Sequence, residues 1–153
     1  MTAGDIPQVQ QVAIKSWHTT YENIIPLNIQ NNFLSKAYSE ERLLARLSSS
    51  PFYVAKIDKQ VIGFANFSNK KADGTVELFA VYLDPDFQGK GIGSALLQVG
   101  IEQLQPTQVF INVEAENRIG RQFYNAKGFQ VIEKFNEVFD GHQLKNVRMS
   151  LNL

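Results

Sequence analysis

A glycine-rich turn is the part of the chain whose residue types and spacing point most directly to chemistry. Gly89, Gly91 and Gly93 occupy alternate positions between an apolar segment that ends at Leu83 and an apolar helical pattern. Backbone N–H groups at a helix start have no partner inside the helix, and the helix dipole adds roughly half a positive charge there. Because glycine lets an anion approach these groups closely, the turn is predicted to bind phosphate, with Lys90 adding a positive charge.

Two common phosphate-binding signatures do not fit this turn. The Walker pattern requires serine or threonine after the lysine, whereas Lys90 is followed by Gly91. The dinucleotide pattern requires a third glycine at the position of Leu96. Glu114 lies near the place of a ribose-binding acid, so the dinucleotide interpretation is weakened and not eliminated. A glycine-rich turn that serves packing alone is the remaining alternative.

The spacing of apolar residues indicates which elements position this turn. Apolar residues recur at helical intervals from Ile6 to Tyr21, and Ser39 followed by two glutamates has the form of a helix start. The segment 22–34 contains Pro26 and is predicted to be a loop or short helical turns. Further helices are expected at 91–104 and 117–127, and strands at 52–57, 61–67, 75–83, 109–113, 129–135 and 144–151. This order predicts a mixed α/β fold with at least one right-handed strand–helix–strand crossover.

Length and composition limit the classes of protein. The 153 residues are expected to form a single domain over 1–153, large enough to bury a core. There is no cysteine, which excludes disulfides and thiolate–metal sites, and the 15 basic residues balance the 15 acidic ones, which gives no support for nucleic-acid binding. No apolar run is long enough to span a membrane, and the N-terminus does not have the pattern of a signal peptide. A cytoplasmic protein is expected.

Two motifs together resemble a known family. The segment 88–93 is similar to the coenzyme A signature of the GNAT superfamily of N-acetyltransferases, which reads arginine or glutamine, two residues, glycine, one residue, and glycine or alanine. Asn117, Gly120, the pair 123–124 and the pair 128–129 resemble the family's downstream block of asparagine, a small residue, Phe-Tyr and Gly-Phe. Alanine is commoner in the family where Gly120 stands. The resemblance covers nearly the whole chain.

The resemblance implies a fold and an acetyl donor. The fold would be a GNAT-type mixed, mainly antiparallel twisted sheet flanked by helices, in which the central strands 75–83 and 109–113 are splayed. Acetyl-CoA would lie between those strands. The family normally opens with a strand before the first helix, and the residues 1–5 are too few for a full one. That strand is therefore expected to be lost, frayed or outside the start of this chain.

The resemblance also assigns the residues that would bind acetyl-CoA. The arm of the carrier would pair with backbone groups of 81–83, and its pyrophosphate would lie on the N–H groups from Gln88 to Ser94. The N–H of Val81 would polarise the thioester carbonyl, and Asn117 would either bond the arm or only cap its helix. No metal is implied, since His18 and His142 are isolated. The implied cofactor-binding residues are Val81, Tyr82, Leu83, Gln88, Gly89, Lys90, Gly91, Ile92, Gly93, Ser94, Asn117 and Tyr124.

The implied chemistry is direct attack of an amine on the thioester, which requires a base and an acid. Glu77 is the first candidate for the base, because it lies in an otherwise apolar strand, eleven residues before Gln88, where histone-acetylating relatives carry glutamate. A solvated Glu77 at the strand's edge is an equal alternative, and Glu114 or water alone are the other candidates for the base. Tyr124 is the candidate acid, which would protonate the departing thiolate.

The acceptor is expected to be a primary amine. In this superfamily the acceptor pocket is built from the regions that correspond to 21–27 and 133–142. Glu133, Glu137 and Asp140 would give the second region a mildly acidic rim, suited to a polyamine, an amino sugar or a peptide amine. A catalytically silent coenzyme A-binding sensor or interaction module is the alternative function. A homodimer is compatible with the sequence and is the commonest symmetric assembly.

Overall fold

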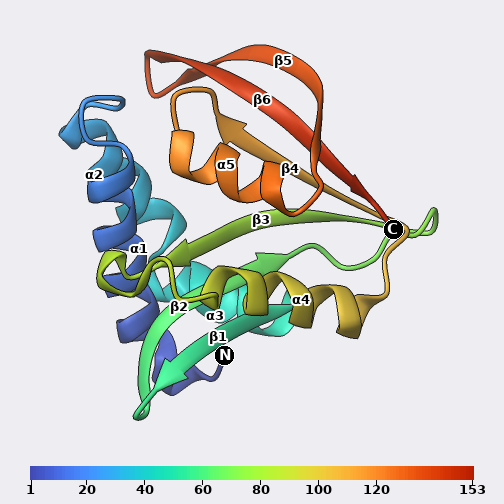
Figure 1. Ribbon diagram of the computed structural model, residues 1–153. Helices are drawn as coiled ribbons and strands as arrows, with labels where there is room; N and C mark the ends of the chain where they lie inside the picture. Colours follow the sequence, from blue (N-terminus) through green and yellow to red (C-terminus); the bar gives the residue numbers. More distant parts are fainter.

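The computed structural model describes all residues from 1 to 153. The elements in chain order are η1 (Ala3–Asp5), α1 (Ile6–Thr20), α2 (Leu27–Ala37), α3 (Glu40–Ser49), β1 (Phe52–Ile57), β2 (Gln60–Phe67), β3 (Thr75–Leu83), η2 (Pro85–Phe87), α4 (Ile92–Leu104), β4 (Gln108–Glu114), α5 (Arg118–Ala126), β5 (Gln130–Phe139) and β6 (His142–Asn152). The helices α1, α2 and α3 come first, the strands β1, β2 and β3 follow, and α4, β4, α5 and the hairpin β5–β6 complete the chain (Figure 1).

The six strands form a sheet in the order β1-β2-β3-β4-β6-β5. All neighbours are antiparallel except β3 and β4, which run parallel and are joined through α4. A parallel pair needs such a crossover, because a short hairpin cannot connect two strands that point the same way. The predicted mixed, mainly antiparallel sheet flanked by helices is therefore confirmed.

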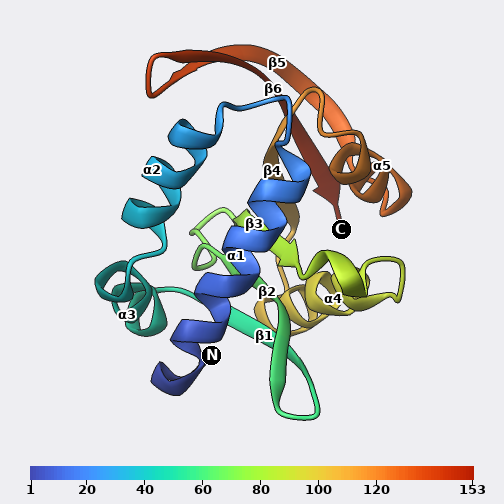
Figure 2. The ribbon, with the colours of Figure 1, turned by 90° about the vertical axis from the view of Figure 1, so that its left-hand side faces the viewer.

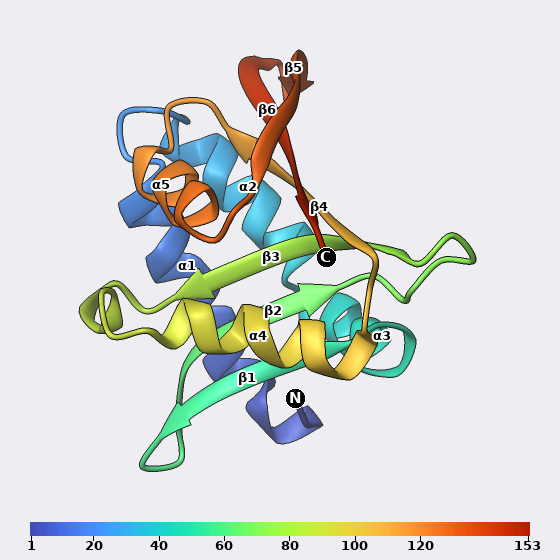
Figure 3. The same cartoon turned by 45° about the vertical axis from the view of Figure 1, so that its right-hand side comes forward.

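The two central strands, β3 and β4, are paired only at their beginning. Only the segment Thr75–Glu77 of β3 pairs with β4, and beyond it the strands diverge (Figure 3). On the other edge of β3, Phe67 pairs with Leu78 while Asn66 pairs with Ala80. Phe79 is thus an extra residue, a bulge, and bulges bend a strand and increase its twist. The bulge lies where β3 leaves β4, which explains the splayed shape that the sequence resemblance predicts.

Helices cover both faces of the sheet. The helices α1, α2 and α3 lie on one face, and α4 and α5 lie on the other (Figures 1 and 2). The first core centres on Val9 and Phe64, and the second on Phe67 and Val109, each of which is completely buried. The bulge also divides β3 between the cores, since Leu78 packs in the second and Ala80 in the first.

The N-terminal third differs from the sequence prediction in one element. The segment 22–34 is not only loop, because α2 begins at Leu27 and continues to Ala37. Pro26 is the residue immediately before this helix, so it starts the helix instead of interrupting it. No strand precedes α1, as expected from the few residues before it. No helix has both the length and the apolar character to cross a membrane.

Gly100 is predicted to be essential for the packing of α4 on β2. A β-carbon at this position would overlap the ring of Phe67, which is completely buried. Overpacking of this kind costs about 1–3 kcal/mol, so Gly100→Ala should lower Tm by about 2–10 °C in a thermal melt. Gly4→Ala is the control, because its β-carbon would meet only Thr2 at 3.8 Å. Equal melting temperatures for the two variants would contradict the prediction.

Candidate active site

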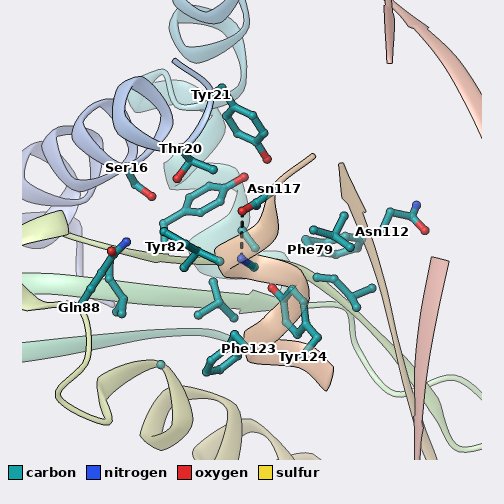
Figure 4. Close-up of a pocket in the computed structure, with 18 of the residues that line it drawn as sticks. Ser16, Thr20, Tyr21, Phe79, Tyr82, Gln88, Asn112, Asn117, Phe123 and Tyr124 are labelled. Carbon is teal, nitrogen blue, oxygen red and sulfur yellow. Dashed lines mark hydrogen bonds between the residues drawn. The ribbon is translucent and has the colours of Figure 1, made fainter. Parts of the chain in front are cut away.

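A cavity of about 200 Å³ occupies the split between β3 and β4. Its walls come from α1, the second half of β3, the glycine turn, β4 and α5 (Figure 4). None of its lining residues is acidic, basic or histidine. The hydroxyl ends of Tyr21, Tyr82 and Tyr124 point toward the space beside Asn117. The cavity is therefore uncharged, and its mainly apolar lining includes several groups that can form hydrogen bonds.

The glycine turn presents a row of free backbone amides at one end of this cavity. Gly89 and Gly91 have φ of +77° and +78°, a conformation that side chains rarely adopt. A β-carbon added at either glycine would meet nothing within 4 Å. None of the six consecutive N–H groups from 89 to 94 has a backbone partner. Open amides at the start of α4 fit a diphosphate, because they combine free donors with the positive end of the helix dipole.

One edge of β3 is open beside the cavity. The N–H of Asp84 donates to the carbonyl of Ile62 at 2.8 Å, which makes these two residues a hydrogen-bonded pair of the β2–β3 ladder. Backbone hydrogen bonding alternates along such a ladder. The N–H of Tyr82 is therefore directed toward β2, and the N–H groups of Val81 and Leu83 are directed toward β4. Because β4 has already diverged, these N–H groups are available to an extended ligand, which would add to the edge like another strand.

The helix α5 forms the opposite wall. The side chain of Asn117 caps it by accepting a hydrogen bond from the N–H of Gly120 at 3.0 Å. A β-carbon at Gly93 would lie 3.1 Å from the ring of Phe123. The glycine at the start of α4 therefore permits α4 and α5 to approach one another closely. This contact brings the downstream motif against the glycine turn, although the two are about 30 residues apart in the sequence.

Tyr124 is a cavity residue whose hydroxyl holds its proton at neutral pH. It is 7% exposed, and its hydroxyl points into the cavity (Figure 4). Burial raises the pKa of this hydroxyl well above its usual value, and the nearby Tyr82 acts in the same direction. The hydroxyl is therefore protonated at neutral pH and can donate to an anion that forms beside it.

The two candidate bases lie in different surroundings. Glu77 does not line the cavity and instead forms an ion pair with Arg148 of β6. Glu114, at the end of β4, is 6% exposed, and burial raises the pKa of its carboxyl. It accepts a hydrogen bond from the N–H of Glu116 at 2.6 Å, and its charge acts on Tyr21, which lines the cavity. Glu114 does not line the cavity either, but its carboxyl is the more buried of the two and acts on a residue that does.

The acidic residues of the β5–β6 hairpin lie outside the cavity. Asp140 accepts a hydrogen bond from Asn32 of α2 at 2.6 Å, and Glu137 accepts one from Asn146 at 2.7 Å. Neither they nor Glu133 line the cavity. The contact of Asp140 with Asn32 ties the hairpin tip to α2, so this residue has a structural partner.

Several lining residues are not among those that the motifs pointed to. Ser16 and Thr20 of α1 lie one helical turn apart and face the cavity, which Phe79 of the bulge and Asn112 of β4 also line. Ser16 is only 5% exposed. Polar residues at this spacing, within a helix that is otherwise apolar on its buried side, were the one signal in the sequence that could have identified the α1 pair.

Comparison with known proteins assigns the chain to a class. Residues 13–129 match the Acetyltransferase (GNAT) family. The uncharacterized N-acetyltransferase YuaI of Bacillus subtilis is 34% identical over 94% of this chain and 85% of its own length. The spermidine N(1)-acetyltransferase of Thermoplasma acidophilum is 29% identical over 86% of each chain. This chain therefore belongs to the GNAT family of N-acetyltransferases.

A solved structure agrees with the fold and with coenzyme A as the carrier of the acetyl group. The PaiA N-acetyltransferase of Thermoplasma acidophilum, solved in complex with coenzyme A, superposes with a TM-score of 0.85 and 25% identity, covering all of this chain and 96% of that one. The protein is thus an acetyl-CoA-dependent acyltransferase that acts on an amine. The free amides of the glycine turn and the open edge of β3 are the features of this chain that fit such a donor.

Proposed function

We propose that this protein acetylates a primary amine by direct attack inside the cavity between β3 and β4. The observation that carries the proposal is a convergence of groups. The free amides of 89–94, the outward N–H of Val81 and the hydroxyl of Tyr124 all face the same split. Acetyl-CoA, when bound, supplies a thioester carbonyl as the point of attack. The residues of this chain supply the binding groups, an oxyanion donor and the proton transfers.

Val81 is proposed as the oxyanion donor. Its N–H is fixed by the β2–β3 ladder and directed toward the split, so it needs no reorganisation when negative charge develops on the carbonyl oxygen. One such fixed donor contributes about 2.7–4 kcal/mol to comparable acyl transfers. The residues beside it, Tyr82 and Leu83, line the same cavity and would hold the carrier's arm in register.

The acceptor must lose a proton before it attacks, since an alkyl amine has a pKa near 10.4 in water. The uncharged cavity disfavours an ammonium ion and therefore lowers that pKa. We propose that Glu114 takes the proton through water, because its buried carboxyl has a raised pKa and lies near Tyr21. Tyr124 then donates its proton to the departing thiolate.

The assignment of the base predicts a change in the pH dependence. A base acts only when unprotonated, so wild-type kcat/KM should fall as pH falls through the raised pKa of Glu114. Glu114→Gln should lower kcat by ~100-fold or more and remove that fall from the pH profile. Glu77→Gln should retain the fall of kcat/KM at low pH. Glu116→Gln, which removes a carboxylate near Glu114, is the control and should retain it as well. Loss of the acid limb in Glu77→Gln instead would make Glu77 the base.

A panel of amines tests the function itself. Spermidine, an amino sugar and a lysine peptide would each be mixed with acetyl-CoA, and release of free thiol would be followed. The spermidine acetyltransferase among the relatives supports the inclusion of polyamines. Release that depends on one of the amines supports the proposal. Calorimetric binding of acetyl-CoA without release for any amine would favour the alternative of a coenzyme A-binding sensor.

A further inference from the structure

Arg148 of β6 connects three strands at the closed end of the split. Its guanidinium forms an ion pair with Glu77 of β3, in which both of its terminal nitrogens contact the carboxylate. One of these nitrogens also donates to Oδ1 of Asn112 in β4 at 2.9 Å. The guanidinium lies over the ring of Phe110, with its central carbon 4.6 Å from the ring centroid. One side chain thus makes four contacts on two neighbouring strands.

The position of these contacts is specific. Glu77 and Phe110 form the last pair in the short β3–β4 ladder, and the strands diverge beyond them. Asn112, two residues later on β4, already lines the cavity. The contacts of Arg148 therefore straddle the point where the two strands separate.

The direction of the side chain is informative because another carboxylate was available. The cross-strand partner of Arg148 on β5 is Glu133, yet the ion pair forms with Glu77, two strands away. A planar guanidinium can bind a carboxylate with two donors and stack on a ring at the same time. The Glu77 and Arg148 side chains are only 19% and 24% exposed, so solvent screens their attraction less than at an open surface.

We propose that Arg148 is a positioning residue that fixes where β3 separates from β4. The β3–β4 ladder has only three residue pairs, so backbone pairing alone holds the two strands together weakly before they diverge. The ion pair and the bond to Asn112 add a second fastening at the same place. This fastening sets the width of the split, and hence the alignment of the Val81 N–H with the reacting carbonyl. The inference rests on the proposed function.

The test compares Arg148→Met, Arg148→Lys and Glu77→Gln, with kcat, the KM for each substrate, the Kd of acetyl-CoA and Tm measured for each. Misalignment at a catalytic site costs about ten- to a hundredfold in rate. Arg148→Met should therefore lower kcat by about tenfold or more, and Arg148→Lys should recover part of it, because lysine restores the ion pair without the second donor or the stacking on Phe110. Glu77→Gln should resemble Arg148→Met, and the double variant should be no worse than either single variant, because both remove the same fastening.

Two comparisons make the proposal falsifiable. Arg121→Met is the matched control, since Arg121 donates one bond to the carbonyl of Ala115 at 3.2 Å and does not line the cavity. It should change Tm without changing kcat. A purely structural role would lower Tm in Arg148→Met and leave kcat at the level of this control, and that result would overturn the inference. So would additive losses in the double variant with Glu77→Gln.

The pH profile separates this inference from the assignment of the base. Positioning predicts that Arg148→Met and Glu77→Gln lower kcat equally and keep the wild-type acid limb. A catalytic Glu77 predicts that only Glu77→Gln loses that limb, and this outcome would contradict the inference. If wild-type protein releases no thiol with any amine, the proposed function fails first. If wild type is active and Arg148→Met equals it, only the inference fails.

Discussion

Replacement of Tyr124 with phenylalanine is expected to reduce kcat by ~100- to 10,000-fold while leaving the affinity for acetyl-CoA nearly unchanged. The substitution removes one oxygen and keeps the ring, which packs 5.3 Å from Phe129 and 5.2 Å from Phe123 between ring centroids. The cavity wall therefore keeps its shape. The only group lost is a buried hydroxyl, whose pKa is raised by burial. This hydroxyl carries the proton that the thiolate would receive. Steady-state kinetics with calorimetry measure the two quantities separately.

The same variant should also show a characteristic pH dependence. A thiol has a pKa near 8.5, so above that pH the thiolate can leave without being protonated. The deficit of Tyr124→Phe should consequently narrow as pH rises through that value. Tyr53→Phe is the control, because Tyr53 lies on β1, packs on Phe67 and does not line the cavity. Turnover of Tyr124→Phe equal to that of the wild type would remove Tyr124 from the role of acid.

Substitution of Gly91 by alanine should have the largest effect on binding, weakening the affinity for acetyl-CoA by about 10- to 100-fold. The β-carbon would project into the open space where the diphosphate is expected to approach the amides. It would also oppose a φ of +78°, which turns those amides outward. Hydrogen bonds to charged groups contribute about 1.5–3 kcal/mol each, so the loss of one accounts for this range. Calorimetry with coenzyme A measures the change directly.

Gly141 offers a matched control for backbone strain. It has a φ of +79°, and a β-carbon there would also meet nothing within 4 Å, but it lies at the tip of the β5–β6 hairpin. Gly91→Ala and Gly141→Ala should therefore both lower Tm, because each strains the backbone. Only Gly91→Ala should weaken the affinity for acetyl-CoA. If Gly91→Ala bound coenzyme A as tightly as Gly141→Ala, the glycine turn would not be the diphosphate site. At saturating acetyl-CoA the rate of Gly91→Ala should approach that of the wild type, because the substitution affects binding and not proton transfer.

The parts of the site that the sequence predicts well are local. A helix start with free amides needs only a few consecutive residues, so the spacing of Gly89, Gly91 and Gly93 was sufficient to predict the turn that precedes α4. The cap formed by Asn117 is local for the same reason, since its acceptor and the N–H of Gly120 are three residues apart. The order of strands and helices followed from apolar periodicity, which reports the buried face of each element separately.

The parts that the sequence did not predict depend on residues far apart in the chain. Pro26 suggested a break, but it precedes α2, because a proline is equally compatible with a helix start. Nothing in the apolar run of β3 marks Phe79 as a bulge, since a bulge is defined by the register of the partner strand. Glu77 satisfied every local criterion for a base, yet its closest partner is Arg148, 71 residues later.

The chain by itself determined the glycine turn before α4, the capped helix that carries Tyr124 and the class of fold, because hydrogen-bonding and burial patterns of consecutive residues encode these features. Only the tertiary structure decided where β3 and β4 separate and which side chains meet there. Those contacts join α1, β3, β4 and β6, and the spacing of residues within one element contains no information on the distance between elements. The uncharged character of the cavity was decided in the same way, by the packing that turns its acidic neighbours elsewhere.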